Sequence, residues 1–380
     1  MKHLFTLLSA LLFSIVTISA QNINDLPRTI YSQEWKAGHI QGIAIDAKKG
    51  YIYYSFTTML IKADLQGNII GTVKGLLGHL GCIEFNEEDG RIYGSLEYKN
   101  DSIGRGILKQ ENTTKHWDSA FYVAIFDVDK ITREGMNAEK DGIMTSVYLP
   151  TVLEDFEAKV VSNGKTLEHR YGCSGFDGIT FGPKFGKNDG KRYLTIAYGI
   201  YGDANRTDNN YQVLLQYDTK DWAKYEHPLS QEAMHTYGPK KPAGRYFVYT
   251  GNRNWGVQNM EYDATRNFWF LATYESKKSD FSGFTLHAID GNIAPKKQNL
   301  KGVDYAKKQN VLTLCGRGMT DTNHIDVRGW FFDKASTGMH ALGNNYYYIS
   351  HRKRNKPFQS CTATLYRFIG SETKPFVLVE

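Results

Sequence analysis

Three histidines and one aspartate stand near the start of short strand-like segments, where side chains of these types could transfer protons or hold a metal ion. They are His39, His79, His340 and Asp177. A histidine titrates near neutral pH, and a carboxylate beside it can serve as the matching acid, base or metal ligand. We therefore predict that these four residues are catalytic. The alternative is that they only line a polar channel, with Asp177 bonding the backbone amides of a turn.

The segments that carry these residues are weak copies of one another. Each begins with a small or polar residue, passes through an apolar alternation and ends in turn residues, and a second strand-like run follows it. Self-similarity of this kind indicates a repeated hairpin. The first segments are 38–46, 79–86, 175–182, 256–263 and 338–343, and the runs that follow are 52–56, 92–96, 193–198, 269–274 and 347–351.

The first repeat, 39–74, is the compact one. It predicts four antiparallel strands, at 39–46, 51–56, 59–63 and 68–73, which is one blade of a β-propeller. With 25 Tyr, 20 Phe and 36 Gly but only 9 Pro, the composition is typical of aromatic strands broken by glycine turns. No long stretch has helical spacing with proper caps. We predict an all-β fold, a single propeller of five four-stranded blades.

Six blades is the alternative, if 302–333 or the N-terminal strand builds a blade of its own. We expect the strand at 29–35 to close the ring against the last repeat. The fourth strand of blade three is predicted near 222–228, and that of blade four near 296–300.

Insertions lengthen the connections on one face of this propeller. The loops between second and third strands, and the connectors between blades, all lie at the end where the first strands begin. Long loops on one face of a rigid scaffold usually carry binding or chemistry. The lengthened segments are 99–119, 199–210, 275–282, 352–360, 151–173, 229–255 and 301–336.

A second set of residues at the same end is suited to bind an anionic sugar. Arginine pairs with carboxylate, sulfate or phosphate groups, and aromatic rings stack on sugar faces. The alternatives are that the aromatic residues pack against the rim and that the basic run 351–354 is a solvated loop. The predicted substrate-binding residues are Gln41, Arg170, Tyr198, Arg206, Trp255, Gln258, His351 and Arg352.

Residues 1–20 have the layout of a secretory signal peptide, with Lys2 ahead of an apolar run and a cut near Ala20. The apolar run is too short to be a membrane span. We expect a secreted or periplasmic protein whose single propeller domain is 21–380. Removing Lys2 lowers the net charge from +6 to +5, which is too diffuse to indicate nucleic-acid binding.

Four cysteines occur in this exported chain: Cys82, Cys173, Cys315 and Cys361. Their spacing contains no CxxC pair, so a zinc site made of cysteines is not expected. Two interpretations remain: Cys82 and Cys173 form a disulfide, or the cysteines are buried free thiols.

The repeats resemble those of secreted bacterial β-propellers of the broad lactonase, phytase-like and NHL type. The resemblance lies in runs such as Gly42-Ile-Ala-Ile-Asp46 and Asp177-Gly-Ile-Thr-Phe181. The richness in Lys, Asn and Tyr is similar to that of exported proteins of Bacteroidetes. This resemblance implies a propeller fold. It assigns no catalytic residue to this chain, because no family motif is matched residue by residue.

We expect a secreted carbohydrate-active enzyme, a hydrolase or a lyase, that cleaves an acidic glycan or glycoside in a central funnel. Its partner would be an anionic small molecule or oligosaccharide. One alternative is a metal-dependent phosphoesterase or lactonase with a divalent metal such as calcium in the central channel. Another is a non-enzymatic propeller that binds glycans or proteins. HExxH, GxSxG and P-loop motifs are absent from the sequence.

Overall fold

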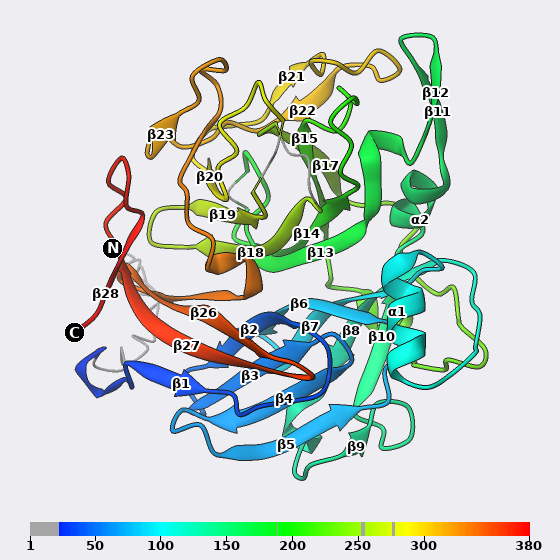
Figure 1. The fold of residues 1–380 in the computed structure, drawn as a ribbon, viewed down its shortest axis with the longest axis vertical. Coiled ribbons are helices and arrows are strands. Elements are labelled where there is room, and N and C mark those ends of the chain that lie inside the picture. The colour runs from blue at the N-terminus through cyan, green and yellow to red at the C-terminus, as the bar shows by residue number, and fades with distance from the viewer. Residues whose placement is uncertain (1–22, 188, 252–254, 276–277) are drawn as a thin grey trace, which may run out of the picture.

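A computed structural model describes residues 23–187, 189–251, 255–275 and 278–380. Five β-sheets surround a central axis, as Figure 1 shows. The chain is therefore the predicted all-β propeller of five blades. The predicted signal peptide lies outside the described residues. The innermost strands are β2 (Ile40–Asp46), β6 (His79–Asn86), β13 (Cys173–Gly182), β18 (Val257–Asp263) and β25 (Met339–Gly343).

The blades share one antiparallel order from the axis outward, and several have extra strands at the outer edge. Blade one continues with β3 (Tyr51–Phe56), β4 (Met59–Asp64), β5 (Ile69–Lys74) and β9 (Met136–Asn137), and blade two with β7 (Arg91–Tyr98), β8 (Ala120–Phe126), β10 (Met144–Tyr148) and β16 (His227–Pro228). Blade three continues with β14 (Tyr193–Ile200), β15 (Tyr211–Tyr217), β17 (Gly244–Tyr249), β22 (Gln309–Val311) and β21 (Lys296–Gln298), and blade four with β19 (Phe268–Thr273) and β20 (Leu286–Asp290). Blade five continues with β26 (Tyr346–Asn355) and β27 (Phe358–Phe368).

The N-terminal strand closes the ring. β1 (Thr29–Tyr31) pairs antiparallel with β27, so the first and last parts of the described chain meet in one blade. β28 (Phe376–Leu378) pairs with the same strand further along. This pairing confirms the predicted closure. It also leaves the first strand without a blade of its own.

The hydrophobic core is divided into layers between neighbouring blades. The largest joins blades two and three, and four further clusters join blades one and two, five and one, four and five, and three and four. Apolar side chains from facing sheets interdigitate in each layer, and burying them is the main stabilising contribution. Five such layers close the ring.

Two predicted fourth strands are wrong. In blade three the fourth strand is β17, because 222–228 begins with the short 3-10 turn Trp222–Lys224 and ends at Pro228, which has no N–H for a central ladder. His227–Pro228 instead pairs at the edge of blade two. The other expected strand, at 296–300, corresponds to β21, whose exposed Lys296 and Lys297 suit a sheet edge, and it pairs with β22 in blade three's sheet.

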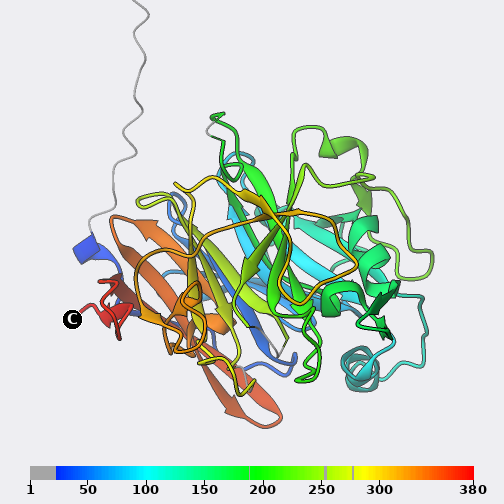
Figure 2. The same ribbon diagram turned by 90° about the horizontal axis from the view of Figure 1, so that it is seen from above.

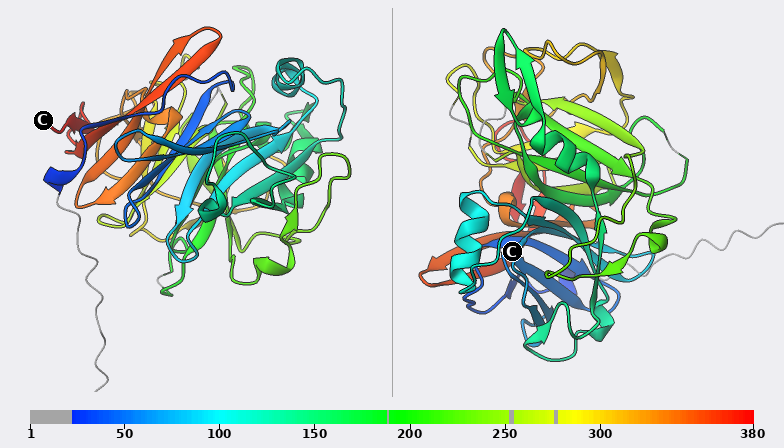
Figure 3. Two further views of the ribbon diagram at one scale, coloured as in Figure 1. Left: turned by 90° about the horizontal axis from the view of Figure 1, so that it is seen from below. Right: turned by 90° about the vertical axis from the view of Figure 1, so that its right-hand side faces the viewer.

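Two short helices occupy segments that were predicted only as long loops. They are α1 (Ser102–Gln110) and α2 (Pro150–Glu157). Figure 2 shows α1 and the β26–β27 hairpin projecting on one side of the propeller, and the turn between β13 and β14 projecting on the opposite side. Figure 3 shows the same arrangement from below and from the right. We call the side with α1 the loop face and the other side the turn face.

The small hairpins β11 (Lys159–Ser162) with β12 (Lys165–Glu168), and β23 (Met319–Thr320) with β24 (Arg328–Gly329), complete the sheets. Cys82, Cys173, Cys315 and Cys361 are all buried free thiols, so the second of the two cysteine alternatives holds. Among the described residues, no helix is both long enough and apolar enough to cross a membrane.

Candidate functional site

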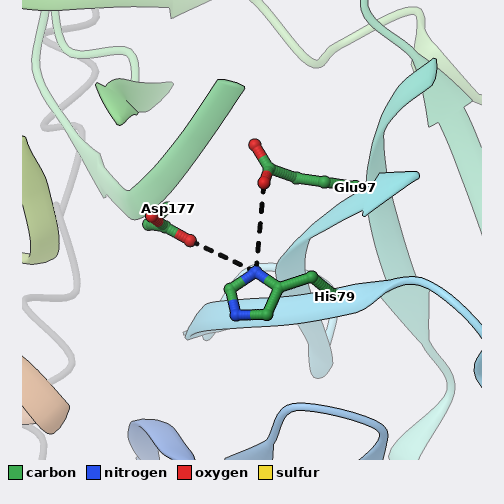
Figure 4. Close-up of side chains that lie close together, drawn as sticks. All are labelled: His79, Glu97 and Asp177. Atoms are coloured by element: carbon green, nitrogen blue, oxygen red, sulfur yellow. Dashed lines mark ion pairs between the residues drawn. The ribbon is translucent and has the colours of Figure 1, made fainter. Parts of the chain in front are cut away.

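His79, Glu97 and Asp177 meet at the loop-face end of the channel, and each comes from a different strand. His79 is the first residue of β6, Glu97 lies near the end of β7 and Asp177 lies in β13. His79 Nδ1 is 3.4 Å from Asp177 Oδ1 and 3.9 Å from Glu97 Oε2. Figure 4 shows both carboxylates directed at the same ring nitrogen. The three groups therefore share one proton-exchange environment.

Local breaks in strand register aim these side chains at the axis. β6 shifts register between Leu80 and Ile83, and β13 shifts between Phe176 and Gly178. A β-bulge adds one residue to a strand and turns the neighbouring side chain, and bulges are common beside functional sites. β2 and β18 shift close to their starts as well. The repeated irregularity explains how the strand starts present polar groups to the channel.

Gly175 lets Glu97 approach the backbone of β13. Its φ is +112°, in the region that favours glycine, and a Cβ at this position would clash with the Glu97 carboxylate. Without that Cβ, the N–H of Phe176 donates a hydrogen bond to Glu97 Oε1. The glycine thus holds the carboxylate in place.

A buried lysine neutralises Glu97. Lys99 Nζ lies 2.7 Å from Glu97 Oε2, and the two side chains are only 5% and 2% exposed. The ammonium also donates a hydrogen bond to the carbonyl of Ser174 at 2.6 Å and lies 3.8 Å from Asp101 Oδ2. A buried ion pair is kept only when further hydrogen bonds satisfy it, and here they do.

Asp101 links this ion pair to α1 and to an aromatic residue. Its carboxylate caps α1 by accepting the N–H groups of Ile103 and Gly104 at 3.0 and 2.9 Å. It also accepts the hydroxyl hydrogen of Tyr201 at 3.1 Å. The helix end, the lysine and the tyrosine are therefore fixed relative to one another.

Burial shifts the pKa values of the two carboxyl groups toward neutrality and that of the histidine away from it. Burial raises the pKa of Glu97 to about 7, although Lys99 acts against this. Burial likewise raises the pKa of Asp177 to about 6. Burial lowers the pKa of His79 to about 4, so the imidazole is neutral at pH 7 and can accept a proton.

The two oxygens of Asp177 have different surroundings, and the buried Oδ1 faces His79 Nδ1 at 3.4 Å. Oδ2 accepts a hydrogen bond from Gln258 Nε2 at 3.3 Å, while Oδ1 has no hydrogen-bond partner among the described residues. Gln258 is itself fixed by donating to the carbonyl of Trp255 at 2.8 Å. The structure thus brings predicted residues Asp177, Gln258 and His79 together.

Trp255 lies beside this cluster. Its backbone has φ of +60°, the residue is 39% exposed, and its ring centroid is 6.4 Å from that of Tyr201. Backbone strain of this kind often accompanies functional sites. We infer that its exposed part is able to stack on a ligand.

A cavity of about 690 Å³ lies between blades four and five, and His79, Glu97 and Asp177 do not line it. It is lined by Tyr274, Phe331, His351 and Arg352 among others. Burial raises the pKa of Tyr274, Arg352 opposes that rise, and the charge of Asp177 adds to it. Predicted residues Arg352 and His351 therefore belong to a space that a ligand can enter.

His39 and Gln41 lie on the side of this end nearest blade five. Both use Thr57: the His39 N–H and the Gln41 amide donate to its hydroxyl oxygen at 2.9 and 3.2 Å. Burial lowers the pKa of His39, and the charges of Arg352 and Arg354 lower it further. The structure places His39 beside these cations and does not show it in contact with His79.

Three predicted binding residues are engaged in structural contacts. Arg170 pairs with the buried carboxylate of Asp155 at 2.9 Å, and the fully buried Tyr198 donates to the same residue at 2.7 Å. Arg206 makes two hydrogen bonds to Asp208, at 2.8 and 2.9 Å. These contacts use the polar groups of Tyr198 and Arg206 inside the protein, and they tie Arg170, whose side chain is 37% exposed, to Asp155.

His340 is separated from the other three predicted catalytic residues. The loose fifth repeat predicts it at the loop-face ring, but the structure groups it with Glu84 and Glu261. The physical reason is register: the Met339 N–H donates a hydrogen bond to Asn259 Oδ1 at 3.2 Å, so His340 lies further along the channel than the first residue of β6. The expected ring of three histidines is therefore not formed.

Sequence reasoning did not select Glu97, Lys99 or Asp101 for the site. A charged pair at 97 and 99, directly after the apolar strand Arg91–Leu96, is the signal that could have found them. Buried charges of opposite sign at the end of a strand usually face each other or a functional group.

No protein-family model matches this chain, and no curated protein matches it. Solved structures with a distant likeness include a protein of unknown function from Bacteroides caccae, with 9% identity, 74% of this chain and 88% of that chain covered, and a TM-score of 0.33. The soluble aldose sugar dehydrogenase of Escherichia coli has 9% identity, covering 88% and 98%, with a TM-score of 0.35. The Dos1 propeller has 10% identity, covering 90% and 81%, with a TM-score of 0.30.

Proposed function

We propose that the protein is an exported carbohydrate-active enzyme that cleaves an acidic glycan or glycoside at the loop-face end of its channel. The observation that carries the proposal is the contact of His79 Nδ1 with two carboxyl groups whose pKa values burial raises toward neutrality. Groups with displaced pKa values in a polar opening are typical of acid–base catalysis. Export rests on the signal-like residues 1–20.

The arrangement favours elimination over hydrolysis. Glycosidases hold two carboxyl groups about 5 Å or more apart on opposite sides of the scissile bond. Here Glu97 and Asp177 both face one histidine, and Lys99 already neutralises Glu97, so the two carboxyl groups do not form a free acid and nucleophile pair. With Glu97 paired to Lys99, His79 remains as the base and Asp177 as the acid, and both would lie on the same side of a ligand.

In the proposed step, neutral His79 removes the proton next to the carboxylate of a uronate unit. The electron pair of that C–H bond forms a C=C bond, and the bond to the leaving sugar oxygen breaks. Protonated Asp177 gives its proton to that oxygen. Arg352 would meet the uronate carboxylate and stabilise the negative charge that builds up on it.

A metal-dependent phosphoesterase or lactonase is the second candidate. Its support is that His79, Glu97 and Asp177 offer three donor atoms within 4.8 Å of one another. The buried ammonium of Lys99, 2.7 Å from Glu97, opposes a divalent cation at the same place. We therefore prefer the proton-transfer function.

The test is turnover of a panel of acidic oligosaccharides and sugar phosphates by the protein lacking residues 1–20, with and without chelator. We expect chelator-resistant cleavage of a uronate-containing substrate, lost by at least about 100-fold in Asp177→Asn. His227→Ala is the matched control, because this histidine stacks on Tyr237 at the edge of blade two. Chelator-sensitive turnover would support the second candidate. No turnover, with ligand binding unchanged in Asp177→Asn, would overturn both enzyme functions.

A further inference from the structure

A second cluster of titratable side chains lies at the turn-face end of the channel. Glu84, Glu261 and His340 each offer one donor atom, and the three atoms lie within 4.8 Å of one another. Glu84 is five residues beyond His79 along β6, which corresponds to about 16 Å of strand. The cluster is therefore separate from the proposed active site.

The two glutamates occupy equivalent positions of the repeat. Glu84 precedes Phe85 and Asn86, and Glu261 precedes Tyr262 and Asp263, at the same distance from the end of the innermost strand. The corresponding residue of blade three is Thr180, whose hydroxyl donates to Glu84 Oε2 at 3.1 Å. Equivalent positions of neighbouring blades converge on the axis, which brings these side chains together.

Both carboxyl groups are buried with incomplete local compensation. Glu84 is 6% exposed and Glu261 is 4% exposed. Glu261 Oε1 accepts the N–H of Ala341 at 2.7 Å, and the two glutamates hydrogen-bond each other, so they share a proton when no cation is bound. Within the described part of the chain, neither glutamate has an ion pair with a lysine or arginine. Burying a pair of carboxyl groups beside one another is unfavourable unless a proton or a cation is shared between them.

The imidazole of His340 adds an independent observation. Its Nδ1 is shielded from solvent and has no hydrogen-bond partner among the described residues. A buried ring nitrogen without a partner is costly, and a bound ion would satisfy it. His340 also belongs to the three-residue cluster, so an ion bound there would be held by its imidazole and the two carboxyl groups together.

A cavity of about 840 Å³ opens onto this cluster. Glu84, Glu261 and His340 all contribute to its lining. Basic residues of the β13–β14 turn and strand start line it as well: Lys184, Lys187, Lys191 and Arg192. An ion at the cluster is therefore reachable from the turn face, and it faces a space able to hold water or an anionic ligand.

We propose that Glu84, Glu261 and His340 bind a divalent transition-metal ion such as Zn²⁺, with an open coordination position toward the turn-face cavity. Two carboxylates and one imidazole suit Zn²⁺ or Mn²⁺, whereas Ca²⁺ requires six or more oxygen ligands. Three protein ligands plus a free position is the arrangement of reactive rather than purely structural zinc sites. The basic rim would draw an anionic molecule to that position.

The experiment measures zinc binding by the chelator-treated protein lacking residues 1–20, using calorimetry with Zn²⁺ alone and metal analysis after gel filtration. We expect about one equivalent of zinc, bound at least about 100-fold more weakly by His340→Ala and by Glu261→Gln. Zinc should raise the melting temperature of the wild-type protein but not that of His340→Ala. His79→Ala, the histidine at the other end, is the matched control and should bind zinc normally.

The Glu84→Gln variant separates loss of zinc from loss of folding, because its amide oxygen can still accept the hydrogen bond from Thr180. This variant should fold like the wild type and still lose zinc. Zinc bound equally well by His340→Ala, lost in His79→Ala instead, or absent from the wild type would each overturn the proposal. Calcium binding with equal affinity would do the same. None of these outcomes depends on glycan cleavage.

Discussion

The two ends of the channel hold similar side chains in different electrostatic settings. Each end combines a histidine with two carboxyl groups within 4.8 Å. At the loop face, Lys99 is buried against Glu97 at 2.7 Å. At the turn face, burial raises the pKa of Glu84 to about 7, Arg192 acts on it only from a distance, and no ion pair reaches either glutamate in the described ranges.

The difference shows how one scaffold can give two chemistries. A fixed lysine supplies the positive charge at the loop face, so the remaining acid and histidine are free to exchange protons. Without such a lysine, the turn-face carboxyl groups must retain a proton or take a metal ion. The choice between proton transfer and metal binding thus depends on one buried cation.

The largest expected effect comes from making the same substitution at each end. Glu97→Gln leaves the ammonium of Lys99 without its close partner, so we expect a loss of about 3–5 kcal/mol in the free energy of unfolding. Glu84→Gln removes no partner from a buried cation and should cost less than about 1 kcal/mol. Urea unfolding of chelator-treated proteins measures both. Equal losses would contradict the contrast between the ends.

A smaller effect is expected at Gly175. Alanine there meets both a left-handed backbone and the Glu97 carboxylate, so Gly175→Ala should cost about 2–4 kcal/mol. Gly50 also has a positive φ, +71°, but no atom lies within 4 Å of the position a Cβ would take. Gly50→Ala is therefore the control for backbone strain alone, and it should lower the free energy of unfolding by about 1 kcal/mol. Thermal and urea unfolding give the difference. If the two alanines cost the same, Glu97 is not held against β13 as described.

The pH dependence of stability tests the protonation of Asp177. The pKa of Asp177 in the folded protein, about 6, lies above its ordinary value of 3.8. The protonated carboxyl group therefore stabilises the fold fully below about pH 4, and this stabilisation is lost as the pH rises through 6. Asp177→Asn should flatten the decline between about pH 4 and 7 by on the order of 1–3 kcal/mol. Unfolding curves at several pH values measure it, and an unchanged slope would show that the carboxyl is not perturbed.

The smallest effect on stability is expected at Trp255, whose ring is 39% exposed. Trp255→Ala should weaken binding of a glycan ligand by about tenfold, or about 1.4 kcal/mol, while changing stability by less than about 0.5 kcal/mol. Exposed Phe358 at the far hairpin end offers a control, since Phe358→Ala should leave binding unchanged. If Trp255→Ala and Phe358→Ala bind the glycan equally well, the Trp255 ring does not stack on the ligand.

The repeats predicted the fold because every blade reuses one apolar alternation, and the ring closure by 29–31 follows from the same pattern. An insertion interrupts the pattern inside blade three, whose fourth strand begins only at Gly244. At the site, the strand starts predicted His79, Asp177 and Gln258 correctly as neighbours. Glu97 was not among the predicted site residues, because its contact with Phe176 depends on the bulged register of β13, which sequence does not reveal.

The measurement that tests the central claim most directly is the ultraviolet absorbance of the new double bond formed from a uronate-containing oligosaccharide. It should be followed for the wild-type protein, His79→Ala and His340→Ala under identical conditions. The account predicts an absorbing product with the wild type and with His340→Ala, and none with His79→Ala. Product formation that persists in His79→Ala but disappears in His340→Ala would place the chemistry at the wrong end of the channel and contradict the account.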